Sequence, residues 1–122
     1  MRRSLLPMAC AALAGVVPEP AASGPADVIA AEARQSGATW TISATVAHAD
    51  TGWEHYADAF RVVAPDGTVL GTRVLHHPHV NEQPFTRSLS GVAIPEGITD
   101  IRVEAHDSVH GWGGAGVTVT LP

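Results

Sequence analysis

Alternation of apolar and polar residues with a period of two recurs along most of the chain. In residues 39–46 (TWTISATV) every second side chain is apolar, and residues 101–105 (IRVEA) repeat the pattern with charged residues in between. This spacing is typical of strands that bury one face, because successive side chains of a strand point to opposite sides. Helical periodicity is scarce, and only residues 26–34 have a composition that would also suit a helix. The pattern therefore predicts a chain built mainly of strands.

Turn signals rich in Gly and Pro separate these runs, at residues 36–37 (SG), 65–67 (PDG) and 95–97 (PEG). The resulting prediction is seven strands, at about residues 27–34, 38–48, 57–64, 68–75, 85–93, 99–107 and 115–121. Seven short strands in about 100 residues are typical of an immunoglobulin-like sandwich. We therefore expect residues 24–122 to form one all-β domain, an immunoglobulin-like, seven-strand antiparallel sandwich.

The first 23 residues have the features of a secretory signal peptide. Arg2 and Arg3 supply the positive start, residues 5–17 are apolar, and Ala21 and Ser23 have the small-residue spacing of a cleavage site. The apolar run is too short for a bilayer, which needs about 20 residues. The alternative is a buried N-terminal helix. We predict residues 1–23 as a signal peptide, no membrane span in the mature chain, and a periplasmic or secreted protein.

A lipid anchor on Cys10 is a further possibility for this segment. The apolar run that precedes Cys10 is short, however, and Pro7 stands where a Leu would be expected. The sequence therefore favours a cleaved signal peptide over a lipidated cysteine.

Composition narrows the chemistry that is open to the chain. The hydrophobic fraction of 45% and charged fraction of 16% are those of a globular protein. A net charge of −5, with no Lys, argues against nucleic acid or an anionic membrane surface as the main partner. A single Cys excludes a disulfide scaffold and a Cys-rich zinc finger. What remains is imidazole and oxygen chemistry, since the chain contains seven His.

The predicted topology brings the histidines to one end of the domain. If successive strands alternate in direction, loops 48–57, 76–84 and 108–114 lie together, and the turns at the other end contain no His. The residues in or beside the three loops are His48, His55, His76, His77, His79, His106 and His110. Several acids and four aromatic residues, Trp53, Tyr56, Phe85 and Trp112, accompany them.

Strand parity points some of these polar groups inward. His48 continues the inward series of residues 40–46, Asp107 continues that of residues 101–105, and Asp58 shares the parity of Phe60. Buried polar groups need partners, and one metal ion would satisfy several of them. Neutral imidazole is the commonest protein ligand for Zn, Cu and Fe.

Spacing adds further candidate ligands. His77 and His79 flank a proline, so an extended chain points both the same way, and Asp107 and His110 are three apart on a Gly-rich turn. We therefore predict one divalent transition metal, Zn, Cu or Fe. The candidate ligands are His48, His55, His77, His79, Asp107 and His110.

Several alternatives remain open from the residues alone. A single His at a strand end is often only hydrogen-bonded, Asp58 or Asp107 would also pair with Arg87, and residues 76–79 would also suit an exposed loop tip. In a second hypothesis the domain is a non-catalytic binding module. Its ligand surface would consist of Trp53, Tyr56, Phe85 and Trp112.

Two segments resemble the superoxide reductases of the desulfoferrodoxin and neelaredoxin type. Residues 48–56 (HADTGWEHY) are similar to that family's His-Pro segment followed by a second His, and residues 107–112 (DSVHGW) are similar to its terminal Cys-Asn-x-His-Gly-Leu-Trp motif. The resemblance covers residues 40–112. It implies an immunoglobulin-like domain with a metal held by His48, His55 and His110.

The resemblance also implies that Asp107 takes the position of the family's Cys ligand. A carboxylate is a harder and less electron-donating ligand than a thiolate. The family's early His motif has no clear counterpart, and residues 76–79 are its only candidate substitute. The resemblance therefore points to a metal site, with superoxide-reductase-like activity as a further alternative.

Overall fold

The computed structural model describes residues 24–122, and the predicted signal peptide and Cys10 lie outside the described residues. This part of the chain is all-β and contains no helix. Its strands are β1 (Asp27–Ser36), β2 (Thr39–Ala47), β3 (Ala57–Val63), β4 (Val69–Val74), β5 (Phe85–Val92), β6 (Asp100–Asp107) and β7 (Val117–Thr120). The predicted all-β class and the seven strands are confirmed, and residues 27–36 form a strand rather than a helix.

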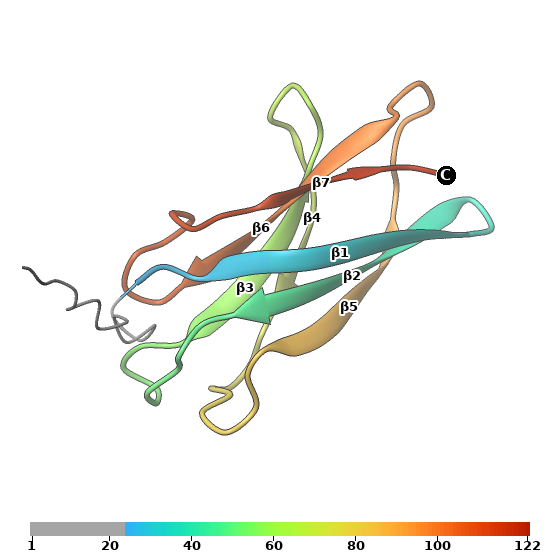
Figure 1. Cartoon of the computed structure of the whole chain (residues 1–122). Coiled ribbons are helices and arrows are strands. Elements are labelled where there is room, and N and C mark those ends of the chain that lie inside the picture. Colours follow the sequence, from blue (N-terminus) through green and yellow to red (C-terminus); the bar gives the residue numbers. More distant parts are fainter. Residues whose placement is uncertain (1–23) are drawn as a thin grey trace, which may run out of the picture.

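The strands form two antiparallel sheets that pack against each other. One sheet has the order β1-β2-β5 and the other the order β4-β3-β6-β7 (Figure 1). Consecutive strands β2 and β3 therefore belong to different sheets, so the loop between them crosses from one layer to the other. This crossing places the end of β2 opposite the start of β3.

The core lies between the two sheets and follows the sequence alternation. Inward side chains of β2 and β6 are buried, while their neighbours face outward. The outward hydroxyl groups of β2 pair with those of β5, as Thr45 does with Thr86 at 2.8 Å. Burial of the apolar face is the main force that holds the sheets together. The largest fully buried apolar side chains are Phe60, Phe85, Ile42, Ile101, Val46, Val62 and Val103.

Three loops gather at one end of the molecule, as the alternation of strand direction predicts. They connect β2 to β3, β4 to β5 and β6 to β7 (Figure 1). The described N-terminal residues reach the same end, because Asp27 pairs with Ala47 at the end of β2. The backbone N–H of Val28 also donates to the carbonyl of Ala115 at 2.8 Å. Four segments therefore surround the histidine-rich end.

The inward position expected for Asp58 is wrong. The pairing of β3 with β6 shifts register between Ala57 and Ala59, and this irregularity turns Asp58 out of the inward series. Its carboxylate instead lies 2.5 Å from Nδ1 of His106, on the outer side of the four-stranded sheet. A bulge inserts one residue and reverses side-chain parity locally, so the alternation alone misplaces Asp58.

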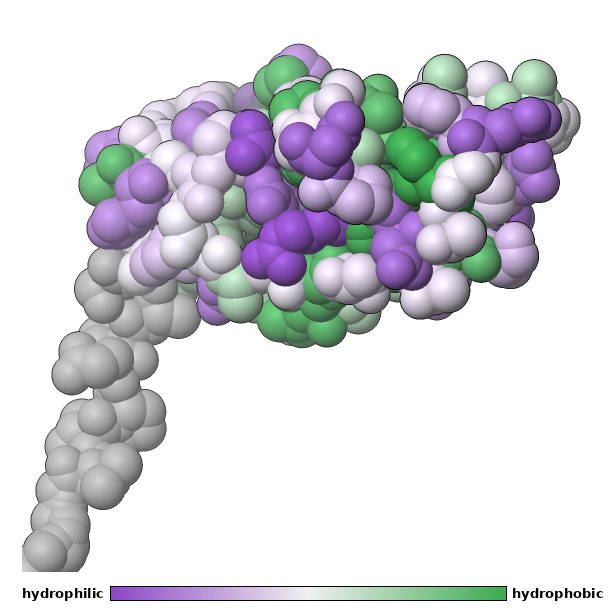
Figure 2. All heavy atoms as spheres, turned by 90° about the horizontal axis from the view of Figure 1, so that it is seen from above, coloured by the Kyte–Doolittle hydropathy of each residue, from purple (hydrophilic) through white to green (hydrophobic). Residues whose placement is uncertain are grey.

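The surface carries no continuous apolar band on the face drawn in Figure 2, where hydrophobic residues appear in separate places among polar ones. Among residues 24–122 there is no helix of the length and apolar character that crossing a membrane requires.

Candidate metal centre

His48 follows β2 directly and continues its inward series into the interior. The residue is 3% exposed, as its parity predicts. Its Nδ1 lies 2.6 Å from Oδ1 of Asp50, and its Nε2 faces the opposite way, toward Asp107. The two edges of this ring therefore contact two different carboxylates.

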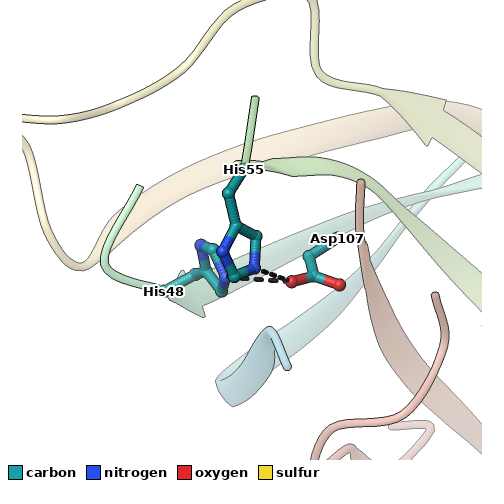
Figure 3. A group of neighbouring side chains, drawn as sticks. All are labelled: His48, His55 and Asp107. Carbon is teal, nitrogen blue, oxygen red and sulfur yellow. Dashed lines mark hydrogen bonds and ion pairs between the residues drawn. The ribbon is translucent and has the colours of Figure 1, made fainter. Parts of the chain in front are cut away.

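Asp107 ends β6 and is the most deeply buried charged group of the cluster, with an exposed fraction of 0%. Three imidazole nitrogens converge on its Oδ2 atom: Nε2 of His55 at 2.5 Å, Nδ1 of His110 at 2.9 Å and Nε2 of His48 at 3.1 Å. Figure 3 shows the side chains of His48, His55 and Asp107 pointing toward one another. The backbone N–H of His110 donates to the other carboxylate oxygen, at 2.5 Å.

These contacts explain why Asp107 stays ionised although it is buried. Burial alone would raise the pKa of Asp107, but hydrogen bonds from the side chain and backbone of His110 and from His55 lower it to about 2. The carboxylate therefore carries its negative charge over the whole physiological pH range.

A compact turn presents His55 to the centre. The backbone N–H of His55 donates to the carbonyl of Gly52, and the N–H of Thr51 donates back to the carbonyl of His55, at 3.2 and 3.0 Å. Gly52 has a φ of 146°, which glycine adopts without strain. The turn orients the ring so that Nε2 points at Asp107.

The nitrogen and oxygen atoms of His48, His55 and Asp107 are close enough together to hold one metal ion. All lie within 4.8 Å of one another, and the two Nε2 atoms are 3.2 Å apart. Tetrahedral zinc, with Zn–N bonds of about 2.0–2.1 Å, separates neighbouring nitrogen ligands by about 3.3 Å. The imidazole pair therefore needs little rearrangement to bind one ion.

Nε2 of His48 lies close to two oxygen atoms and to the Nε2 atom of His55. Because Nδ1 faces a carboxylate, which accepts only, the ring donates its Nδ1 proton to Asp50. In a neutral ring Nε2 then carries a lone pair, yet it faces Oδ2 of Asp107 and the carbonyl oxygen of Gly24, each at 3.1 Å. Among its neighbours, Nε2 of His55 at 3.2 Å can donate a hydrogen bond to this lone pair, and a metal ion bound between the two rings would also satisfy it.

Asp50 contacts His48 on the ring edge that faces away from Asp107, and it is not among the candidate ligands predicted from the sequence. It is 5% exposed, and its carboxylate accepts the backbone N–H of Ala57 at 3.0 Å and that of His79 at 2.7 Å. The sequence signals were its place two residues after His48 and its position in loop 48–57 beside the histidines, and neither reveals these backbone partners.

His77 and His79 lie together but outside the group of His48, His55 and Asp107. The ring of His79 stacks on Phe85, with centroids 3.9 Å apart, and its Nε2 accepts from Arg87 at 3.1 Å. Burial and the charge of Arg87 lower the pKa of His79, so its neutral form is favoured. The buried His79 ring therefore packs on Phe85 of the hydrophobic core, whereas His77 is exposed.

The remaining histidines lie outside the centre. His76 is exposed, and His106 faces the outer side of the four-stranded sheet with Asp58. Trp112 lies against His106 at a centroid distance of 4.8 Å, and the guanidinium of Arg61 lies 4.0 Å from the centroid of the Trp112 ring.

The four aromatic residues do not form one accessible surface. Phe85 is 1% exposed and belongs to the core, because its strand parity continues inward beneath His79. Trp53 is 66% exposed and meets Tyr56 edge to face. Trp112 instead contacts Arg61 of β3 and His106 of β6. The expectation of a shared aromatic surface is therefore wrong for Phe85.

Comparisons with known proteins add a sequence relationship and a fold relationship. No family model matches the chain. Over 77 residues, 63% of this chain, it is 43% identical to a protein of Halomicrobium mukohataei named "Putative lipoprotein", and the match covers 37% of that protein's length. The structure of hypothetical protein PH1083 from Pyrococcus horikoshii OT3 is similar with a TM-score of 0.53 and 15% identity, over 80% of this chain and 89% of that one. The chain thus shares its fold with PH1083 and part of its sequence with a larger protein named as a lipoprotein.

Proposed function

We propose that the domain binds one divalent transition metal at the end where the three loops meet. The observation that carries this proposal is the convergence of three imidazole nitrogens on one buried carboxylate oxygen, Oδ2 of Asp107. Its ligands are His48, His55 and Asp107, with His110 as the fourth. The side chain of His110 is 36% exposed, so it forms the solvent side of the centre.

The donor set indicates which metals suit the centre. A ligand set of imidazole nitrogens and one carboxylate oxygen is suitable for Zn²⁺ and Cu²⁺, and such a set also binds Fe²⁺. No thiolate takes part, since the described residues contain no Cys. The proposed role is metal carriage or storage, with redox chemistry as an extension if the bound metal is Cu or Fe.

We place this function outside the cytoplasm, in the cell envelope or secreted. The support is the name of the Halomicrobium mukohataei relative and the signal-like composition of residues 1–23. Periplasmic and secreted locations are both compatible with this proposal.

A finer part of the proposal concerns ancestry. We propose that the domain is immunoglobulin-like and related to the superoxide reductase iron domain, with Asp107 at the position of the Cys ligand. The order of His48, His55, Asp107 and His110 along the chain supports it, as does the proximity of these side chains. The loss of the thiolate favours metal binding over superoxide reduction.

Elemental analysis of untagged protein, purified after export, tests the proposal. We expect close to one Zn, Cu or Fe per chain in the wild type and its loss in the His48→Ala/His110→Ala double variant. A His76→Ala/His77→Ala variant is the matched control, because both rings are exposed and outside the ligand group. Affinity should fall as the pH is lowered, since protons compete with the metal for the ligand histidines.

A wild type that stays metal-free after incubation with Zn²⁺, Cu²⁺ and Fe²⁺ would overturn the proposal and favour a binding module. Metal content that is equal in the double variant and the wild type would also contradict it, as would binding that is unchanged down to about pH 5.

A further inference from the structure

The carboxylate of Asp50 is buried, and the metal ligands proposed above do not include it. We infer that Asp50 is the positioning residue of the centre: it holds the Nδ1 proton of His48, so that the Nε2 lone pair of His48 faces the metal. This inference rests on the proposed metal function and deepens it. Among the described residues, the hydrogen bonds of the Asp50 carboxylate go to His48 and to the backbone of Ala57 and His79. None of them goes to His55 or Asp107.

The chemistry of imidazole requires such a group. A neutral ring has two tautomers, and only the one with its proton on Nδ1 leaves Nε2 free to bind an ion. An ionised carboxylate only accepts, so Oδ1 of Asp50 at 2.6 Å selects that tautomer. A carboxylate on the far nitrogen also raises the basicity of the ligand, and loss of such a partner typically costs about 10–100-fold in metal affinity.

The position of Asp50 is fixed before any metal arrives. Oδ1 accepts the backbone N–H of Ala57 at the start of β3, and Oδ2 accepts the backbone N–H of His79 in the loop from β4 to β5. Three segments therefore meet on one carboxylate. The loop that carries His79 contributes to the centre through its backbone, while the His79 ring packs on Phe85.

The protein contains its own matched control for this inference. Asp58 and His106 form a second pair in which a carboxylate oxygen lies 2.5 Å from a histidine Nδ1. That pair is partly exposed, at 27% and 31% for the two side chains, and neither residue belongs to the ligand group. Substitution of Asp58 therefore removes the same kind of contact between a carboxylate and a histidine Nδ1, at a position outside the proposed metal centre.

The first experiment measures the zinc dissociation constant of the full chain by competition with a chelator. Asp50→Asn keeps the size of the side chain but removes its charge, and we expect zinc binding about 10–100-fold weaker than in the wild type. Asp58→Asn should bind zinc as the wild type does. If Asp50→Asn binds as tightly as the wild type while His48→Ala/His110→Ala does not bind, the inference is wrong and the metal function stands.

A second measurement uses only wild-type protein, so it does not depend on the folding of a variant. The ¹⁵N and ¹H resonances of the His48 ring report which nitrogen holds a proton. We expect a protonated Nδ1 in both the metal-free and the zinc-loaded protein, and a zinc-bound Nε2 in the latter. An unprotonated or zinc-bound Nδ1 would overturn the inference. Failure of the wild type to bind any of the three metals would instead contradict the proposed function.

Discussion

Asp107 is the residue on which the histidine cluster depends. It is completely buried, and its carboxylate accepts hydrogen bonds from the side chains of His55 and His110 and from the backbone of His110. A buried carboxylate without these donors would be strongly destabilising. The donors therefore keep an ionised oxygen atom available at the centre.

The lowered pKa of Asp107 leads to a prediction for the metal-free protein. The pKa is about 2 in the fold against an ordinary value of 3.8, so the unfolded chain takes up the proton first as the pH falls. The stabilisation from Asp107 is therefore complete above pH 3.8 and is lost as the pH falls toward 2. We expect this loss to be about 2 kcal/mol in the wild type and absent in Asp107→Asn.

Urea unfolding at several pH values, in the presence of a chelator, measures this difference. Only the slope of the unfolding free energy against pH is compared, because Asp107→Asn also changes the hydrogen bonds of the cluster at neutral pH. Parallel slopes for the two proteins between pH 3.8 and 2 would contradict the assignment of the pKa of about 2 to Asp107.

At the scale of elements, the loop from β6 to β7 is joined to the start of the described chain. The backbone N–H of Ala115 donates to Oδ1 of Asp27 at 2.8 Å, and Val28 donates to Ala115 in return. Gly114 passes so close to the carbonyl of Ala26 that a Cβ atom there would overlap with it. This contact holds the loop that carries His110 beside the segment that carries Gly24.

We predict that Gly114→Ala destabilises the fold by about 1–3 kcal/mol, because the overlap is with backbone and must be relieved by moving two segments. Gly113→Ala is the matched control. Its Cβ would meet its nearest neighbours at 3.6 and 3.8 Å, which is ordinary contact. Thermal unfolding of both variants measures the difference, and equal melting temperatures would show that the close approach is not needed.

For the whole molecule, the centre lies across the two packed sheets. His48 follows β2 of the three-stranded sheet, whereas Asp107 ends β6 and His55 precedes β3 of the four-stranded sheet. The side chains of the proposed ligands come together only when the two sheets pack, because they belong to strands of different sheets. Metal binding should therefore be coupled to the stability of the whole fold.

We predict that zinc raises the melting temperature of the wild type. A ligand that binds only the folded state, at about 100 times its dissociation constant, stabilises that state by about 2.7 kcal/mol. His48→Ala/His110→Ala should show almost no zinc-dependent shift, and His76→Ala should shift as the wild type does. Differential scanning calorimetry with and without zinc measures this, and a zinc-independent melting temperature in a zinc-binding wild type would refute the coupling.

Period-two alternation, together with the Gly- and Pro-rich turn signals, was enough to predict the all-β class, the seven strands and the inward direction of His48 and Asp107. The reason is that side-chain direction along a strand is a local property of the backbone. Alternating strand direction then brought the histidine-rich loops to one end, and this also required no knowledge of the sheets.

Tertiary structure alone decided which of these side chains meet. The bulge in β3 turned Asp58 outward to His106, the packing of His79 on Phe85 removed that ring from the ligand group, and the backbone donors of Ala57 and His79 made Asp50 part of the centre. These outcomes depend on contacts between segments that are distant in the sequence and on the paths of the loops. Neither is encoded in a local repeat of apolar and polar residues, because the alternation describes each strand without reference to its neighbours.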